Sequence, residues 1–186
     1  MNKHARKLIR RARSWAGGLL AVALFASAAV NSASAQTEEG IKAAFVYNFA
    51  KFTKWPTNAF TSDTTPITVG FVGADSLADV FEKIVSGKSI AGRDFTIKRF
   101  AGAAGVENCH MVFASDTQAA AVISATTGKP ILTIGDSESF SSAGGMINLV
   151  KNGAKIRFDI DFTTVQPSQL KLDSRLCQLA RNIKGR

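Results

Sequence analysis

The feature that most constrains the fold is an alternation of strand-like and helix-like segments between residues 66 and 136. Buried strands are typically rich in apolar and β-branched residues, and four segments have this character: residues 66–73, 93–100, 109–115 and 131–136. Helical apolar spacing occurs at residues 75–87, with Ser76 as the expected cap and Gly87 as the stop, and at about 117–126. Such alternation forms βαβ units. We therefore predict an α/β fold in which helices cover both faces of a largely parallel sheet, giving three layers.

An aromatic helix is predicted before this alternation, within residues 41–56. Its large apolar residues recur at helical spacing and should form one buried stripe: Ile41, Phe45, Phe49 and Phe52. The pair Trp55-Pro56 should end the helix, because the residue before a proline is kept out of helical geometry. Tyr47 and Lys51 lie off the stripe, so burial does not account for them.

The last third of the chain predicts an antiparallel hairpin. Asn152-Gly153 is a strong two-residue turn signal between two strand-like segments. A turn at this pair places Leu149 opposite Ile156 on an apolar face, and Asn148 opposite Arg157 on a polar face.

A final helix is expected to open at Pro167-Ser168 and to bury one apolar stripe, formed by Leu172, Leu176, Leu179 and Ile183. No repeat or second linker interrupts residues 36–186. We predict that these residues form a single domain.

The first 35 residues have the pattern of a secretory signal peptide. Six basic residues and no acid precede an apolar, small-residue run, and Ala33-Ser34-Ala35 offers a cleavage site before Gln36. A retained membrane anchor is less favoured, because the run is shorter than the ~20 residues that a spanning helix needs. Cleavage removes the six basic residues and lowers the net charge from +9 to +3. An exported chain without a basic stripe is not expected to bind nucleic acid.

Five ordered motifs carry a resemblance to a known family: Lys42–Pro56, Cys109–Phe113, Ile131–Ser137, Gly144–Asn148 and Lys155–Phe158. On these motifs the chain resembles the YfiR family of periplasmic proteins. The resemblance covers essentially all of residues 36–186. It implies a Rossmann-like α/β sandwich that acts as a regulator rather than an enzyme and needs no cofactor.

The resemblance also implies partners. YfiR-like proteins bind the sensor region of an inner-membrane diguanylate cyclase, YfiN-like, and hold it inactive, which controls cyclic-di-GMP and biofilm formation. An outer-membrane lipoprotein, YfiB-like, can sequester the repressor. Family analogy is also compatible with a homodimer.

The chain departs from the family pattern at its cysteines and at Asp161. The best-known members have two disulfides, but this chain has two cysteines, and Gly70 stands where a partner of Cys109 is expected. Cys109 and Cys177 either form one bridge in the oxidising periplasm or stay as two buried free thiols. Asp161 replaces an expected Asn and adds charge to a strand edge.

Residues that burial in the apolar core does not account for are candidates for partner contact. They form one group on the first helix and one on the hairpin: Tyr47, Lys51 and Trp55, and Asn148, Arg157, Asp159 and Asp161. Tyr, Trp and Arg are enriched among residues that anchor interfaces. The alternative is a solvated face with Trp55 folded over the helix end.

Loops after the carboxyl ends of parallel strands are where such sheets bind small molecules. This rule predicts a pocket rim made of Gly73, Asp75, Ser76, Ser115, Asp136 and Ser137, and makes a small-molecule-binding module the main alternative function. A less favoured alternative is a hydrolase in which Ser137 of the Gly-Asp-Ser segment is the nucleophile and His110 the base. His110 is the one histidine after residue 35, so no metal site is expected.

Overall fold

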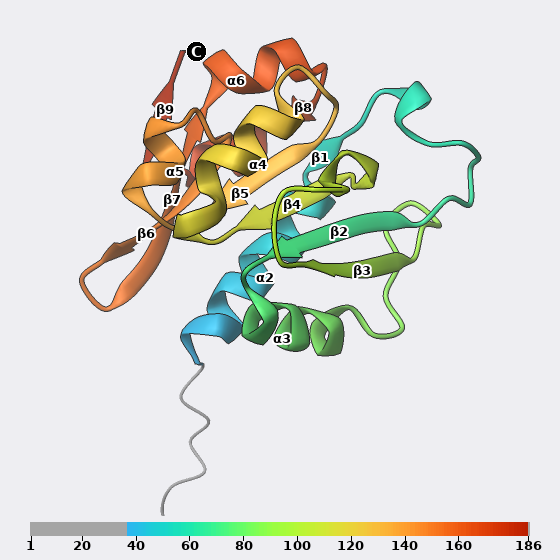
Figure 1. Cartoon of the computed structure of the whole chain (residues 1–186), viewed down its shortest axis with the longest axis horizontal. Coiled ribbons are helices and arrows are strands. Elements are labelled where there is room, and N and C mark those ends of the chain that lie inside the picture. Colours follow the sequence, from blue (N-terminus) through green and yellow to red (C-terminus); the bar gives the residue numbers. More distant parts are fainter. Residues whose placement is uncertain (1–36, 186) are drawn as a thin grey trace, which may run out of the picture. The chain divides into compact units, whose positions relative to one another are not determined.

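The computed structural model describes residues 37–185 (Figure 1). In this part of the chain, seven strands form a sheet in the order β3-β2-β4-β5-β6-β7-β9. Their bounds are β2 (Ile67–Val72), β3 (Phe95–Phe100), β4 (Met111–Ala114), β5 (Leu132–Gly135), β6 (Ile147–Asn152), β7 (Lys155–Asp161) and β9 (Asn182–Lys184). Neighbouring strands of this sheet are parallel except for the antiparallel pair β6 and β7. The predicted α/β class and largely parallel sheet are confirmed.

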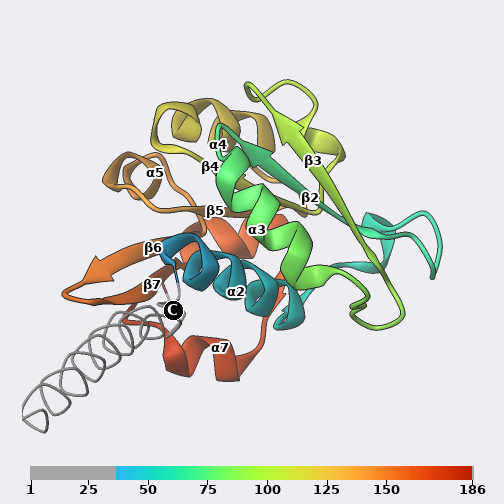
Figure 2. The same cartoon turned by 90° about the horizontal axis from the view of Figure 1, so that it is seen from below.

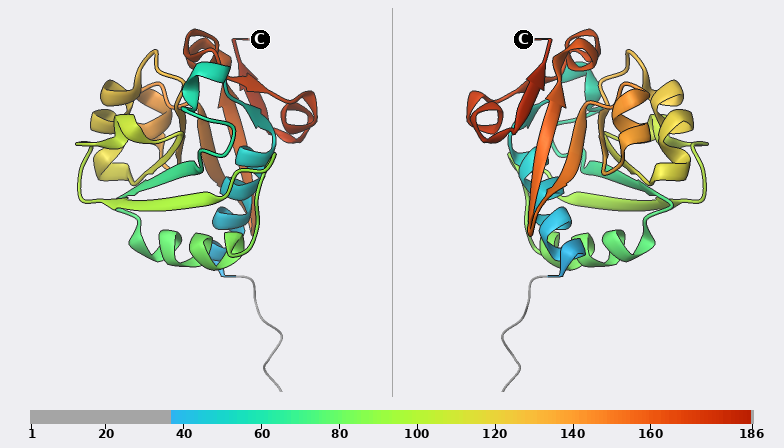
Figure 3. Two further views of the ribbon diagram at one scale, coloured as in Figure 1. Left: turned by 90° about the vertical axis from the view of Figure 1, so that its right-hand side faces the viewer. Right: turned by 90° about the vertical axis from the view of Figure 1, so that its left-hand side faces the viewer.

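Helices lie on both faces of the sheet, as Figure 2 and Figure 3 show. One face carries α2 (Glu38–Lys51), α3 (Asp75–Val85) and α7 (Ser174–Leu179), and the other carries α4 (Ala119–Thr126) and α5 (Glu138–Ser142). Alternate residues of a strand face opposite sides: Met111 of β4 belongs to the apolar cluster under α2 and α3, and Val112 to the cluster under α4. The three predicted layers are therefore present.

Short segments connect these elements. They are β1 (Thr53–Lys54), β8 (Lys171–Leu172), α6 (Phe162–Val165) and 3-10 turns at Thr57–Ala59, Val106–Asn108, Asp116–Gln118 and Gln166–Ser168. No helix within residues 37–185 combines the length and the apolar character that crossing a membrane requires. The predicted signal peptide and its cleavage site lie outside the described residues.

The first helix differs from the prediction in its end and its buried face. α2 ends at Lys51, and Thr53-Lys54 already pairs with Lys171-Leu172 as a strand. Of the predicted stripe, Phe49 is fully buried, whereas the other three residues are partly buried. The fully buried positions of α2 are Ala43, Val46, Phe49 and Ala50. The stripe shifted because α2 packs against α3 as well as against the sheet, where Phe158 contacts Phe45 and Phe49.

The hairpin forms in a register two residues away from the predicted one. Leu149 pairs with Phe158 and Asn148 with Asp159, so the loop residues are Gly153-Ala154 rather than Asn152-Gly153. A shift of two keeps every side chain on its predicted face, because strand side chains alternate with a period of two. The observed register also pairs Ile147 with Ile160 and buries both.

The predicted long final helix is wrong. Pro167-Ser168 lies in a 3-10 turn, Leu172 belongs to β8, and the helix α7 covers only Ser174–Leu179. Ile183 lies in β9, which pairs with β7, and Leu179 is 65% exposed. Gln169 adopts a left-handed conformation (φ 63°) that ends the preceding turn, and the Asp173 side chain accepts the Arg175 N–H at the start of α7.

The start of α3 also differs from the prediction. α3 begins at Asp75 after Ala74, and no side chain caps it, so Ser76 lies inside the first turn and is not the cap. Its end agrees with the prediction, because the helix stops at Val85 and Gly87 adopts a positive φ of 69°.

Candidate functional site

The candidate site lies where neighbouring strands of the sheet end at different levels. β5 ends at Gly135, which is in register with Asn148, whereas β6 continues to Asn152 before the chain turns into β7. The β6–β7 hairpin therefore extends past the carboxyl end of β5. The segment after β5, from Asp136 onward, and the first turns of α2 meet this extension.

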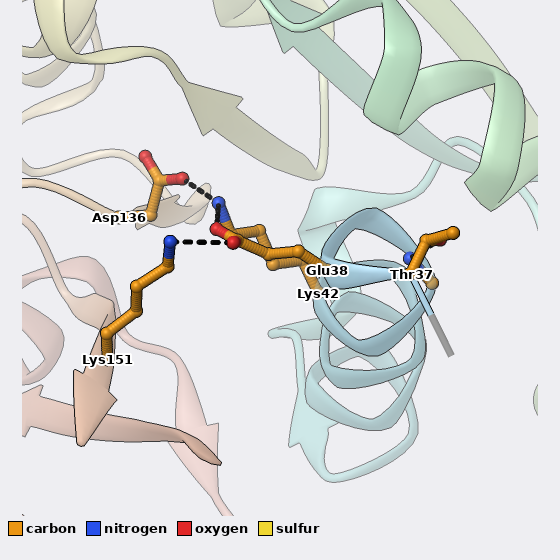
Figure 4. A network of polar contacts seen from close by, with 6 residues as sticks. Thr37, Glu38, Lys42, Asp136 and Lys151 are labelled. Carbon is orange, nitrogen blue, oxygen red and sulfur yellow. Dashed lines mark hydrogen bonds and ion pairs between the residues drawn. The ribbon is translucent and has the colours of Figure 1, made fainter. Parts of the chain in front are cut away.

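A chain of ion pairs joins these three elements (Figure 4). Lys42 Nζ lies 2.6 Å from Asp136 Oδ2 and 2.8 Å from Glu38 Oε1, and Lys151 Nζ lies 2.7 Å from Glu38 Oε2. Thr37 caps α2 by accepting the Gly40 N–H, which orients this first turn. The chain of ion pairs thus connects α2, the β5–α5 loop and β6.

The ion pairs shift the pKa of two groups. Hydrogen bonds from Lys151 and Lys42 lower the pKa of Glu38 to about 2. Burial disfavours the Lys42 ammonium, but hydrogen bonds to Asp136 and Glu38 outweigh this effect and raise its pKa. Glu38 and Lys42 are therefore charged over the whole physiological pH range.

A polar cavity of about 760 Å³ lies beside this chain of ion pairs. Its lining consists of Glu38, Lys42, Asp136, Ser137, Glu138, Ser141, Ser142, Asn148, Leu149, Val150, Lys151, Ile156, Asp159 and Arg181. Asn148 is 7% exposed, and its buried Oδ1 atom has no hydrogen-bond partner. A buried acceptor without a partner is costly and unusual in a native protein. Asn148 Oδ1 is therefore an unsatisfied acceptor enclosed within the protein next to the cavity.

A smaller cavity of about 270 Å³ brings the predicted pocket-rim residues together. Gly73, Asp75, Ser76, Ser115 and Asp136 all line it, while Ser137 lines the larger cavity. It lies where the strand order reverses, because the chain leaves β2 for β3 on one side and returns to β4 on the other. The binding role of these residues stays a prediction.

Gly73 lets the two loops at this point approach each other. Its φ is +64°, and a Cβ atom there would lie 2.6 Å from Ser115 Oγ. Lys42 and Asp136 line both cavities. The Lys42–Asp136 ion pair therefore lies between the larger and the smaller cavity.

The partner-contact candidates on the first helix do not lie together with those on the hairpin. The Tyr47 ring packs against Phe95 of β3, with ring centroids 6.0 Å apart, and Lys88 Nζ lies 5.0 Å from the Tyr47 ring centroid. Lys51 is exposed at the end of α2. β3 and the hairpin stand at opposite ends of the strand order, so Tyr47 is not part of the hairpin surface.

Trp55 folds back onto the amino-terminal end of β4. Its Nε1–H donates to the backbone oxygen of His110 at 3.1 Å, and its ring meets the Phe60 ring edge-on. Phe60 in turn stacks on the His110 ring, with centroids 4.4 Å apart. The central carbon of the Arg93 guanidinium lies 3.9 Å from the centroid of the Phe60 ring. These contacts favour a structural role for the Trp55 indole.

Of the hairpin candidates, Asp159 and Asp161 are ion-paired, whereas Arg157 is exposed. Arg181 holds Asp159 through two hydrogen bonds, of 2.9 and 2.5 Å, and Lys184 Nζ lies 2.9 Å from Asp161. Burial opposes ionisation of Asp161, but hydrogen bonds from Thr163 and Lys184 outweigh it and lower the pKa. Arg157 lies on the same face of β7 and is exposed.

The structure separates the two residues of the hydrolase hypothesis. His110 precedes β4 and Ser137 follows β5, at opposite ends of parallel strands, and one strand length between them is about 13 Å. His110 Nδ1 accepts the Thr68 N–H, and Nε2 lies 3.0 Å from the Ala59 oxygen. Burial lowers the His110 pKa. Ser137 caps α5 by accepting the Phe140 N–H, so this pair cannot act as nucleophile and base.

Cys109 and Cys177 are both buried and both free. Cys109 belongs to the apolar cluster on the α4 face of the sheet, and Cys177, a residue of α7, belongs to the cluster on the α2 face. The sheet therefore lies between the two thiols, and the bridge considered from the sequence does not form. Burial raises the pKa of the Cys109 thiol to about 11.

Five charged residues of the site were absent from the sequence-based candidates: Glu38, Lys42, Glu138, Lys151 and Arg181. Glu38 and Lys42 are spaced for an i,i+4 ion pair, which is a recognisable signal. Nothing local indicates the other contacts, because Lys42 meets Asp136 across 94 residues and Arg181 meets Asp159 across 22. Among the described residues, no group of three or more His, Cys, Asp or Glu side chains could hold a metal ion.

Solved structures resemble this chain in fold. A conserved domain protein from Vibrio cholerae O1 biovar El Tor str. N16961 has a TM-score of 0.51 and 11% sequence identity, covering 76% of this chain and 60% of that one. The ABC domain from Streptococcus pneumonia, solved with L-Trp, has a TM-score of 0.46 and 11% identity, covering 68% of this chain and 58% of that one. The first similarity shows the α/β fold alone.

Comparison with family models identifies the family. No curated protein matches the chain. The family model described as YfiR/HmsC-like matches residues 39–181, which include the α2 ion pairs, the β5–α5 loop and the hairpin. The match covers most of the 186 residues, and the chain therefore belongs to the YfiR/HmsC-like family.

Proposed function

We propose that this protein is a periplasmic regulator that binds and represses a YfiN-like inner-membrane diguanylate cyclase, and so controls cyclic-di-GMP and biofilm formation. Membership of the YfiR/HmsC-like family over residues 39–181 carries this proposal. A YfiB-like outer-membrane lipoprotein would compete for the repressor and release the cyclase.

The contact surface that the geometry favours is the face of β7 that carries Arg157, Asp159 and Asp161. Asp159 and Asp161 on this face are ion-paired to Arg181 and Lys184. Arg157 is exposed on the same face, and no ion pair involves it within the described residues. An unpaired arginine on an otherwise neutralised face can pair with an acid of the partner, and arginines are frequent anchors of interfaces.

The test is a complementation experiment in the native host. Deleting the gene should raise cellular cyclic-di-GMP and biofilm, and the wild-type gene should restore both. The Arg157→Glu gene should lower cyclic-di-GMP and biofilm less than the wild-type gene does, because the reversed charge repels the partner's acid. Lys98→Glu is the matched control, since Lys98 is also an exposed strand cation but lies on β3 at the far edge of the sheet.

Physical association is tested separately by purifying the tagged protein from envelope fractions and identifying what co-elutes. A membrane diguanylate cyclase should co-elute with the wild type and with Lys98→Glu, and less with Arg157→Glu. Unchanged cyclic-di-GMP after deletion, together with no cyclase in the eluate of cells that express both proteins, would refute the repressor function.

A further inference from the structure

The long connection between β1 and β2, residues 56–65, is attached to the sheet by few contacts (Figure 1). None of these residues is buried, so the apolar core alone does not hold the segment in place. Within the described part of the chain, its hydrogen bonds to other segments come from His110 and Arg93, and the atoms bonded are the backbone oxygens of Ala59, Ser62 and Thr65. We call residues 56–65 the cover.

His110, which directly precedes β4, holds the cover through its ring. Phe60 stacks on the ring, and Nε2 lies 3.0 Å from the Ala59 oxygen. Nδ1 accepts the Thr68 N–H at 2.9 Å, beside a 2.8 Å backbone bond from the His110 N–H to the Thr68 oxygen. Because Nδ1 accepts, the proton of the neutral ring is on Nε2 and is donated to Ala59. The neutral ring therefore satisfies both contacts.

A second proton does not fit this arrangement. It would sit on Nδ1 and face the Thr68 N–H, which would lose its acceptor. The charged ring would also lie against Phe60, which already has the Arg93 guanidinium 3.9 Å from its centroid. Burial and the charge of Arg93 lower the pKa of His110, although the bond to Ala59 opposes them. The attached cover and a protonated His110 thus disfavour each other.

No acid compensates for a charge on this ring. None of the carboxylates in residues 37–185 forms an ion pair with His110. The neighbouring Cys109 thiol is neutral, because burial raises its pKa to about 11. The other charged residues on the surrounding segments are all exposed, and solvent screens them: Lys54, Asp63, Asp94, Lys98, Glu107 and Lys129. Arg93 is therefore the charged group that acts on the ring.

We propose that residues 56–65 form an acid-sensitive cover, which detaches from the sheet when His110 takes up a proton. Detachment gives the charged ring the access to water that the attached cover denies it. It also opens a cavity of about 530 Å³, which the cover lines together with Trp55, Ile67 and Ile90. Acid thus exposes apolar surface at this end of the sheet. The inference does not depend on the proposed repressor function, because it concerns the protein without a partner.

The experiment is acrylamide quenching of Trp55 fluorescence as the pH is lowered, with circular dichroism measured at each pH. In the protein as its host processes it, without the predicted signal peptide, Trp55 is the one tryptophan and His110 the one histidine. The Trp55 ring meets Phe60 of the cover edge-on, so its accessibility reports on detachment. Quenching should rise as the pH falls below 6.5, the ordinary histidine value, while the circular dichroism stays constant. Because detachment takes up one proton, its equilibrium constant should grow by up to about tenfold per pH unit.

Two variants test the assignment to His110. His110→Asn is the matched control, because an Asn amide oxygen can accept the Thr68 N–H but does not titrate, so its quenching should not depend on pH. Phe60→Leu removes the ring that stacks on the imidazole and should move the transition toward pH 6.5.

Constant quenching in the wild type, or the same acid response in His110→Asn, would overturn the proposal. So would a circular dichroism signal that is lost together with the quenching change, because the whole domain would then unfold. An unchanged transition in Phe60→Leu would also overturn it, and this variant decides the matter if His110→Asn does not fold.

Discussion

Adding one methyl group at Gly145 should disrupt the packing that holds α5 on the sheet. Phe140 of α5 is fully buried, and its ring fills the space directly above Gly145 and Gly135. A Cβ atom on Gly145 would overlap this ring well inside van der Waals contact. Gly145 has no positive φ, so the effect is steric and not a matter of backbone conformation.

The size of the effect follows from the two ways in which the clash can be relieved. If the ring leaves its site, the loss approaches that of a Phe→Ala change, about 3–5 kcal/mol. If the backbone shifts instead, overpacking costs about 1–3 kcal/mol. We expect Gly145→Ala to lower the unfolding free energy by about 2–4 kcal/mol, and to lower the melting temperature by on the order of 10 °C.

The assay is thermal and urea unfolding of Gly145→Ala beside Gly102→Ala. Gly102 also lacks a positive φ, and a Cβ there meets nothing closer than 3.8 Å, so this control should be neutral or slightly stabilising. Phe140→Leu should be less harmful in the Gly145→Ala background than in the wild type, with a coupling energy of about 1 kcal/mol or more. A Gly145→Ala protein that melts with the control would refute the reasoning.

Three further predictions follow from the site and its surroundings. The Glu38 pKa falls from 4.5 to about 2 on folding, so its stabilisation is present above pH 4.5 and lost as the pH falls toward 2. At neutral pH, Glu38→Gln should therefore have an unfolding free energy about 0.5–1 kcal/mol lower than that of the wild type, as is typical of an exposed ion pair. Near pH 2 the two proteins should be equally stable, and urea unfolding at both pH values measures the difference. Cys109 and Cys177 should react with a thiol reagent only as fast as the protein opens, because both are buried; rapid labelling of the native protein would contradict this. Arg181→Ala should shift the urea midpoint only slightly, since solvent screens the pair of Arg181 with Asp159; a shift as large as that of Gly145→Ala would contradict this.

The sequence was sufficient to predict features that depend on local pattern. The βαβ order and the layers follow from the spacing of apolar residues, which reports on each segment separately. The polar face of the hairpin was assigned correctly even though the register was shifted, because a slip of two residues leaves Asn148 and Arg157 on the same face. The clustering of Gly73, Asp75 and Ser115 followed from the shared edge of parallel strand ends.

Other features were decided by contacts between distant segments. The expected final helix became β8, α7 and β9, because β1 and β7 offered backbone partners at those positions. The two cysteines cannot bridge because the sheet separates them. The larger cavity could not be located from the sequence, since the Lys42–Asp136 pair spans 94 residues and the Asn148 amide oxygen is orphaned only by its tertiary surroundings. Local periodicity thus determined the order of the elements and the face on which each hairpin side chain lies, whereas the meeting of polar groups from separate elements required the packed sheet to place them side by side.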